Sequence, residues 1–162
     1  MGYEVDVKSE YKLARSVVLR NSLIFSFLLT TTLIIDALLV IFSKEDYLLN
    51  LIIAIIVTVL FSWYAIFFFS IIYRDMNGKY RYYKNIESGI QEVDEVEFIE
   101  KSNELTYVNG LYVYPLKAKY IDGINTEEKT IYVESKELDF NKGDKLTIST
   151  YQRILLKADK HS

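Results

Sequence analysis

Two long apolar runs, separated by a short polar segment, dominate the first half of the 162-residue chain. They occupy residues 23–42 and 48–72, and residues 43–47 between them include one lysine and two acids. A bilayer core about 30 Å thick is crossed by about 20 apolar residues of helix, and both runs reach that length. The pattern predicts a helical hairpin of two transmembrane helices over residues 21–73 in a cell-membrane protein.

The first run has a second interpretation, as a cleaved signal peptide. Basic residues precede it at Arg15 and Arg20. Signal peptides have an apolar region of about 7–15 residues followed by a small-residue cleavage site, and this run is longer and lacks that site. We expect both spans to be retained.

Charges beside the runs predict their orientation. Lysines and arginines that lie close to spans favour the cytoplasmic side of the membrane. Between the two spans there is one such residue, Lys44. We therefore expect both termini in the cytoplasm. The eight cations that flank the outer ends of the two spans are Lys8, Lys12, Arg15, Arg20, Arg74, Lys79, Arg81 and Lys84.

The segments that flank the hairpin are predicted to lie at the inner membrane surface. Residues 1–20 have amphipathic helical spacing, typical of an interfacial helix or of an extension of the first span. Residues 74–92 form a linker or short helix, with the second span ending at Asn77-Gly78. Alternating tyrosines and cations favour a membrane interface over a single-stranded nucleic-acid platform. They are Lys79, Tyr80, Arg81, Tyr82, Tyr83 and Lys84.

One ionisable residue, Asp36, lies inside a predicted span. A charge at the middle of a bilayer costs about 2.5–3.5 kcal/mol on insertion scales. Its expected intramembrane polar neighbours are Thr32, one helical turn earlier, and Asn50 of the second span. Asp36 either bonds to a neighbouring helix near the outer surface or serves as an ion site or as polar glue between protomers.

The second half of the chain changes to the two-residue period of β-strands. Turn signals at Asn109-Gly110, Asp122-Gly123 and residues 141–144 separate the apolar stretches, and Asn-Gly is the strongest hairpin signal. We predict a small antiparallel β domain over residues 93–158, OB-like or SH3-like, in the form of a barrel of five to six strands. Residues 159–162 form a tail.

Tyrosine is frequent, with 14 in the chain. Its ring is apolar and its tip polar, so it suits both half-buried strands and binding surfaces. A concave face of the β domain is therefore a candidate contact site. Its tyrosines are Tyr107, Tyr112, Tyr114 and Tyr120.

Composition limits the chemistry. The chain has no cysteine and one histidine, His161, at its end, and a formal net charge of −3 gives no argument for nucleic acid as a partner. The acidic run before residue 104 lacks the spacing of a calcium loop, which favours a solvated strand over a metal site. No catalytic motif is present, so we expect no enzyme, cofactor or metal.

Two function classes remain. In the first, the hairpin positions a cytoplasmic β domain for protein interaction or self-assembly, with the bilayer and a second copy or another membrane protein as partners. In the second, the barrel is a sensor that binds a small ligand, and the helices oligomerise or perturb the membrane. A filled interior with an exposed strand edge favours the first class, and a deep apolar pocket the second.

The order of parts, with a late turn at Lys142-Gly143-Asp144-Lys145, is similar in layout to NfeD-type membrane proteins with OB-like tails. The soluble half is longer here. The resemblance implies an OB-like tail and gives no residue a role.

Overall fold

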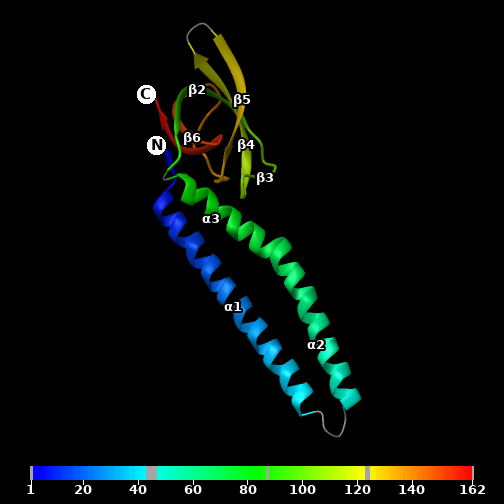
Figure 1. Cartoon of the computed structure of the whole chain (residues 1–162). Coiled ribbons are helices and arrows are strands. Elements are labelled where there is room, and N and C mark those ends of the chain that lie inside the picture. The colour runs from blue at the N-terminus through cyan, green and yellow to red at the C-terminus, as the bar shows by residue number, and fades with distance from the viewer. Residues whose placement is uncertain (1, 43–46, 87, 123–124, 162) are drawn as a thin grey trace. The chain divides into compact units, whose positions relative to one another are not determined.

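The computed structural model describes residues 2–42, 47–86, 88–122 and 125–161, and these form two compact units. One unit comprises residues 1–14 and 78–162 and the other residues 15–77. Figure 1 labels the helices and strands along the chain. In order they are β1 (Tyr3–Glu4), α1 (Val7–Ile41), α2 (Tyr47–Phe67), the π-helical η1 (Phe68–Tyr73), α3 (Arg74–Ile86), β2 (Glu92–Lys101), β3 (Thr106–Val108), β4 (Leu111–Asp122), β5 (Asn125–Val133), β6 (Lys145–Tyr151) and β7 (Ile154–Lys160).

Two helices are long and apolar enough to cross a membrane, as the hydrophobic pattern predicts. The first is α1, and the second is the continuous run from Tyr47 to Ile86. Their large apolar side chains are mostly exposed within the protein, and Trp63 is 72% exposed. The helix α1 begins at Val7, so most of the predicted interfacial segment extends the first apolar helix. The predicted turn at residues 43–46 lies outside the described residues.

The predicted helix end at Asn77-Gly78 is wrong, because α3 continues through both residues to Ile86. Gly78 serves close packing instead of capping. A Cβ at this position would lie 2.8 Å from the Cα of Gly110, which no side chain would tolerate without movement. In a sequence, a glycine within a helical segment is compatible either with a helix end or with a close packing contact. Only the position of the β3–β4 hairpin distinguishes the two.

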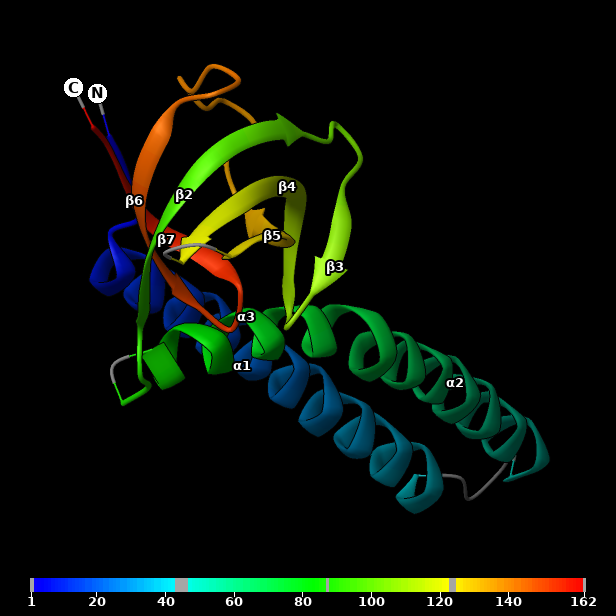
Figure 2. The same cartoon turned by 90° about the horizontal axis from the view of Figure 1, so that it is seen from above.

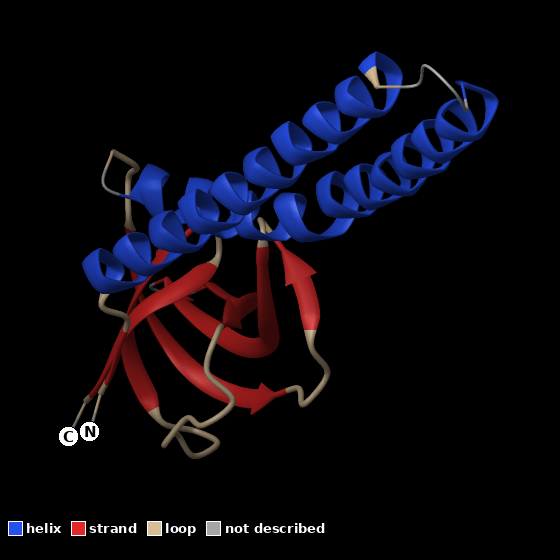
Figure 3. Ribbon diagram, turned by 90° about the horizontal axis from the view of Figure 1, so that it is seen from below, coloured by secondary structure: helices blue, strands red, loops and turns tan. Residues whose placement is uncertain are grey.

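The β domain is a mixed sheet of seven strands, so the predicted β class is confirmed and the barrel is not. The strand order is β1-β7-β5-β4-β2-β6, with β3 paired to β4 and β6 also paired to β7. Figure 2 shows β2 and β4 curving around a common interior. The sheet is not a closed barrel, since in the described chain β5 and β7 share one parallel pair, Tyr132 with Ile154. The added strand is β1, beside β7 at the C-terminal end of the chain (Figure 3).

The predicted Asn-Gly hairpin is confirmed. Asn109 and Gly110 form a two-residue turn between β3 and β4, with φ of 52° and 89°. Positive φ at both residues suits the right-handed twist of the flanking strands. The predicted turn at Asp122-Gly123 lies partly outside the described residues, and Gly143 in the third predicted turn has φ of 91°.

Alternation along the strands fills the interior of the sheet. Leu116 and Ala118 of β4 are buried and Lys117 between them is exposed, as the period of two predicts. Leu138 and Phe140 pack against the same cluster from the loop before β6. The buried members of this cluster are Val96, Phe98, Leu116, Ala118, Ile131, Val133, Leu146, Ile148, Leu155 and Ala158.

A second apolar cluster attaches α3 to the outer face of the sheet. Tyr82, Tyr83 and Ile86 share one side of the helix because residues three and four apart are neighbours. They pack against Leu111, Val113, Ile154 and Leu156. The segment that sequence reasoning assigned to the membrane interface therefore supplies much of the core of the β domain.

Candidate functional site

A polar cavity of about 440 Å³ opens at one end of the sheet interior. Glu92 and Asp94 lie on the same face of β2 as the buried Val96, because side chains two residues apart share a face. In the same way Lys129 continues the buried row of β5, and Thr150 that of β6. The rows that form the apolar core thus turn polar where the interior opens.

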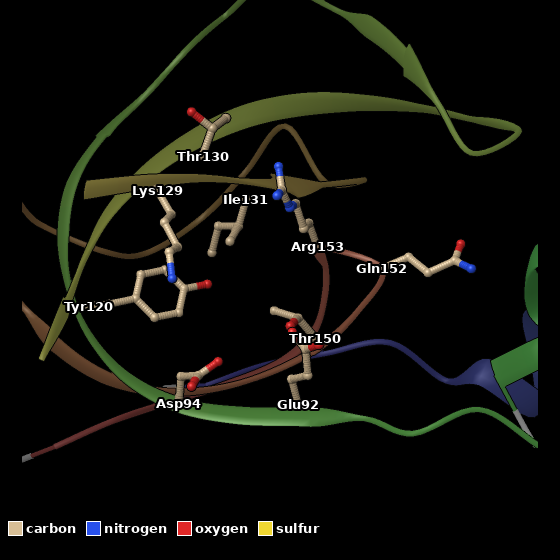
Figure 4. Close-up of a pocket in the computed structure, with 9 residues that line it drawn as sticks. All are labelled: Glu92, Asp94, Tyr120, Lys129, Thr130, Ile131, Thr150, Gln152 and Arg153. Atoms are coloured by element: carbon tan, nitrogen blue, oxygen red, sulfur yellow. The ribbon is translucent and has the colours of Figure 1, made fainter. Parts of the chain in front are cut away.

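Opposite charges line opposite sides of this cavity (Figure 4). Glu92 and Asp94 rise from β2, and Lys129 extends toward them from β5. Arg153, in the turn before β7, lies across the cavity with its guanidinium directed toward β5. Thr150 at the cavity is 1% exposed. The walls are neutral in sum, which suits a ligand that carries both signs of charge.

Tyr120 forms the aromatic wall of the cavity. Its ring lies 5.0 Å from the Nζ of Lys129. Burial raises the pKa of the Tyr120 hydroxyl, and the negative charges of Asp94 and Glu92 raise it further. The hydroxyl therefore stays protonated and can donate a hydrogen bond to a ligand. A second cavity of about 490 Å³ shares Asp94, Tyr120 and Lys129 with the first.

A half-buried polar network joins α3 to Glu134, directly after β5. The Tyr83 hydroxyl donates a hydrogen bond to the Glu134 carboxylate, and Tyr83 is 0% exposed. Burial raises the pKa of Glu134, while the hydrogen bond from Tyr83 and the charge of Lys79 act in the opposite direction. The Nζ of Lys79 lies 2.8 Å from Glu10 and 4.0 Å from Glu134.

The two N-terminal elements also reach this network. Burial raises the pKa of Tyr3, in β1, to about 12. Glu10 belongs to the first turns of α1. The network thus holds β1, the start of α1, α3 and the end of β5 together, which gives it a structural role. Burial likewise raises the pKa of Tyr82 well above its usual range.

The outer edge of β5 is open. β5 pairs with β4 over nine residue pairs, from Tyr114–Val133 to Asp122–Asn125. On its other side, in the described part of the chain, it pairs with β7 only at Tyr132. The backbone N–H of Tyr132 donates to Arg153, so the outward groups belong to Tyr132 and to alternate residues before it. Unpaired backbone groups at a sheet edge are a template for strand addition.

Asp36 bonds to Thr58 of α2, whose hydroxyl donates to Oδ2 over 2.9 Å. Asp36 Oδ1 is buried without a hydrogen-bond partner among the described residues. The expected neighbour Thr32 instead bonds back to the Leu28 carbonyl, and Asn50 lies two turns before Thr58 on α2. Helical periodicity gives the faces of each helix, but the pairing across the hairpin depends on how the two helices pack.

The six residues predicted for the membrane interface divide between burial and exposure. Tyr82 and Tyr83 are buried, while Lys79 joins the network around Glu134. Tyr80 stacks on Tyr11 of α1 at 5.7 Å between ring centroids. Arg81 and Lys84 are exposed on α3.

The four tyrosines of the predicted contact face occupy two places. Tyr107 and Tyr112 pair across the β3–β4 hairpin with ring centroids 5.0 Å apart. Tyr114 and Tyr120 lie at the interior cluster, and Tyr114 has the Nζ of Lys101 5.3 Å from its ring. Of the four, Tyr120 lines the polar cavity.

Sequence reasoning missed the charged residues of the cavity. The signal was present: Glu92 and Asp94 precede Val96 and Phe98 at the same two-residue spacing, so all four share a face. Glu134 and its partners carried no such signal, since they come from four separated segments.

Among the described residues no group of acids or histidines is arranged to hold a metal ion. His161 is exposed, and its Nε2 lies 2.6 Å from the Thr147 hydroxyl.

No protein-family model, curated protein or solved structure matches the chain.

Proposed function

We propose that this is a non-enzymatic integral membrane protein whose hairpin holds the β domain at the cytoplasmic surface, where the open edge of β5 pairs with a second copy of the chain. The single observation that carries the proposal is the contrast between the two sides of β5. Nine residue pairs bind it to β4, and its other side meets β7 at one. The filled interior supports an interaction module over a carrier of apolar ligands.

The length of the open edge suggests the register of self-pairing. Residues 125–131 precede the contact with β7, and Glu128 is their midpoint. The outward backbone groups on this stretch belong to Thr126, Glu128 and Thr130, by alternation from Tyr132. A twofold axis at Glu128 would use the whole stretch symmetrically. It would also place Lys129 of each copy opposite Glu127 of the other.

Introduced cysteines test this register, because the chain has none of its own. Glu128→Cys should form an intermolecular disulfide in native membranes, since directly opposed residues have Cα atoms about 4.5–5.5 Å apart, within disulfide reach. Lys117→Cys, an exposed position on β4, is the control and should stay unlinked. Absence of the linked dimer for Glu128→Cys would refute self-pairing.

Two further variants separate backbone pairing from side-chain effects. Thr130→Pro removes an outward N–H without removing a bond to β4, so it should abolish the dimer in detergent. Glu128→Gln removes repulsion between like charges across the axis, so it should raise the dimer fraction. A dimer that persists in Thr130→Pro would assign assembly to another surface.

Orientation is tested separately. The cations that flank the hairpin support cytoplasmic termini. Lys44→Cys should react with an impermeant thiol reagent on intact cells, and Lys142→Cys should react only after lysis. The reverse pattern would place the β domain outside.

The pairing pattern supports an OB-like fold for the β domain. Strands β2, β4, β5, β7 and β6 follow one another by pairing, with β5 and β7 parallel. An OB fold is a five-stranded, partly open Greek-key barrel. The single pair between β5 and β7 agrees with partial opening.

The polar cavity favours a second candidate, a sensor of small zwitterions. Two acids and two cations line a space of about 440 Å³ beside Tyr120. Calorimetric titration with lysine and arginine should give binding that Asp94→Asn and Lys129→Met each weaken. Putrescine and succinate, with one sign of charge each, are the comparison probes. Equal binding of all four, or binding of none, would exclude the zwitterion site.

A further inference from the structure

Three apolar side chains on the β3–β4 hairpin lie outside both cores. Leu105, just before β3, is exposed, and Tyr107 and Tyr112 are 40% and 53% exposed. Tyr107 and Tyr112 are cross-strand partners, and Leu105 is two residues from Tyr107. Period-two geometry puts all three on one face of the hairpin. The rings of Tyr107 and Tyr112 contact each other, and the face that they form with Leu105 is largely open to solvent.

The hairpin is held against the start of the soluble part of α3. A Cβ on Gly78 would lie 2.8 Å from the Cα of Gly110 and 3.2 Å from the Tyr107 hydroxyl. A Cβ on Gly110 would lie 2.5 Å from the carbonyl carbon of Gly78. Two glycines thus bring the hairpin turn into backbone contact with the helix.

The covalent chain sets how far this contact lies from the second apolar run. Gly78 follows Ile72, the end of that run, by six residues. At about 1.5 Å per helical residue, that is about 9 Å along the helix axis. The polar layer of a bilayer is about 5–8 Å deep on each side, and helix tilt shortens the distance along the membrane normal. The hairpin must therefore lie close to the lipid headgroups if the helix spans.

We infer that the Leu105, Tyr107 and Tyr112 face of the β3–β4 hairpin lies in the headgroup layer of the bilayer that holds the helices. This inference rests on the proposed function, because it takes the second apolar helix to be a span. Tyrosine suits this layer, where its ring contacts the acyl boundary and its hydroxyl stays hydrated. Arg81, exposed one turn after Gly78, adds attraction to anionic lipid.

The consequence is a second attachment of the β domain to the membrane. The predicted interface segment supplies buried tyrosines to the core, and the hairpin takes over the interfacial role. Fixing the domain at a second point would restrict its rotation above the membrane. The open edge of β5 would then be presented in a defined direction.

Depth-dependent fluorescence quenching tests the inference on the full chain in phosphatidylcholine–phosphatidylglycerol vesicles. Trp63 is the one tryptophan of the chain, so the wild type reports on the second apolar helix. A Trp63→Phe background then carries Tyr112→Trp, with Ile121→Trp as the matched control. Ile121 lies on the same strand, nine residues further on, which is about 30 Å of strand.

The tryptophan at position 112 should be quenched several-fold more strongly by lipids labelled at the headgroup than by lipids brominated deep in the chain. The control at position 121 should be insensitive to both. Trp63 should be quenched by the deep bromines. If Trp63 is quenched and position 112 is not, the hairpin does not lie in the headgroup layer, although the second apolar helix lies in the bilayer. If Trp63 itself is not quenched, the proposed membrane function fails first.

Discussion

Gly78 and Gly110 meet backbone to backbone, with 2.8 Å between the Cα of Gly110 and the place where a Cβ on Gly78 would lie. One glycine belongs to a helix and the other to a hairpin turn. The contact joins α3 to the β domain at the point where the helix enters that unit.

Gly78→Ala should destabilise the protein although alanine favours helices by about 1 kcal/mol over glycine. The added methyl group meets backbone, and overpacking costs about 1–3 kcal/mol. Gly110→Ala should cost more, since φ at this position is 89° and the nearest atom lies at 2.5 Å. The measurement is the free energy of unfolding in mild detergent.

Gly143→Ala separates the cost of backbone strain at positive φ from the cost of a steric clash. Gly143 has φ of 91° but its nearest neighbour lies at 4.0 Å, so the variant adds backbone strain without a clash. Strain of this kind costs about 1–2 kcal/mol. If Gly110→Ala and Gly143→Ala cost the same, the backbone contact contributes nothing measurable.

Glu134→Gln should flatten the dependence of stability on pH. The pKa of Glu134 in the folded protein is raised above the ordinary glutamate value of 4.5, chiefly by burial. The folded state therefore binds this proton more tightly than the unfolded state. The resulting stabilisation is complete below the ordinary pKa and is lost as the pH rises through the raised pKa.

Unfolding midpoints measured from acid to neutral pH check this sign. The wild type should lose stability from this group as the pH rises, and Glu134→Gln should not. Glu137→Gln removes a charge from an exposed residue three positions away and serves as the control. A wild-type slope that survives in Glu134→Gln would assign the pH dependence to another group.

Tyr83→Phe should move the same inflection to higher pH. The Tyr83 hydroxyl donates to the Glu134 carboxylate and favours its charged form. Without the Tyr83 hydroxyl, the buried carboxylate loses a hydrogen bond that stabilises its charge. Hydrogen bonds to charged groups contribute about 1.5–3 kcal/mol. The loss should be large at neutral pH and small in acid. A loss of equal size at both pH values would indicate a packing effect alone.

Thr58→Val should weaken the helical hairpin, because it removes the donor to Asp36. Interhelical hydrogen bonds in membranes contribute about 0.6 kcal/mol on average and up to about 1.7. Adding Asp36→Leu should restore much of the loss, since replacing both partners leaves no unsatisfied polar group. The free energy of unfolding in mixed micelles is the quantity measured for this double-mutant cycle. Additive losses would mean that the two residues are not coupled.

Much of the fold followed from local pattern. The two apolar helices, the strands and the Asn109-Gly110 turn were predictable because hydrophobic period and turn chemistry act between near neighbours. The charged cavity could be predicted only in part. The two-residue period places Glu92 and Asp94 on the inward face of β2, but nothing local in the sequence places Lys129 and Arg153 across the cavity from them. No local rule specifies which strand ends meet across an open sheet.

The sequence by itself determined where the chain is apolar enough to span a membrane, which residues alternate inward on each strand and where the first β turn lies. Only the tertiary structure decided that Gly78 packs against Gly110 instead of ending a helix, that Tyr83 is buried on Glu134 and that Asp36 bonds to Thr58. The physical reason is the separation along the sequence over which each interaction acts. Period and turn preference depend on neighbours within a few residues, whereas these three contacts join segments 22–51 residues apart whose meeting depends on the packing of whole elements.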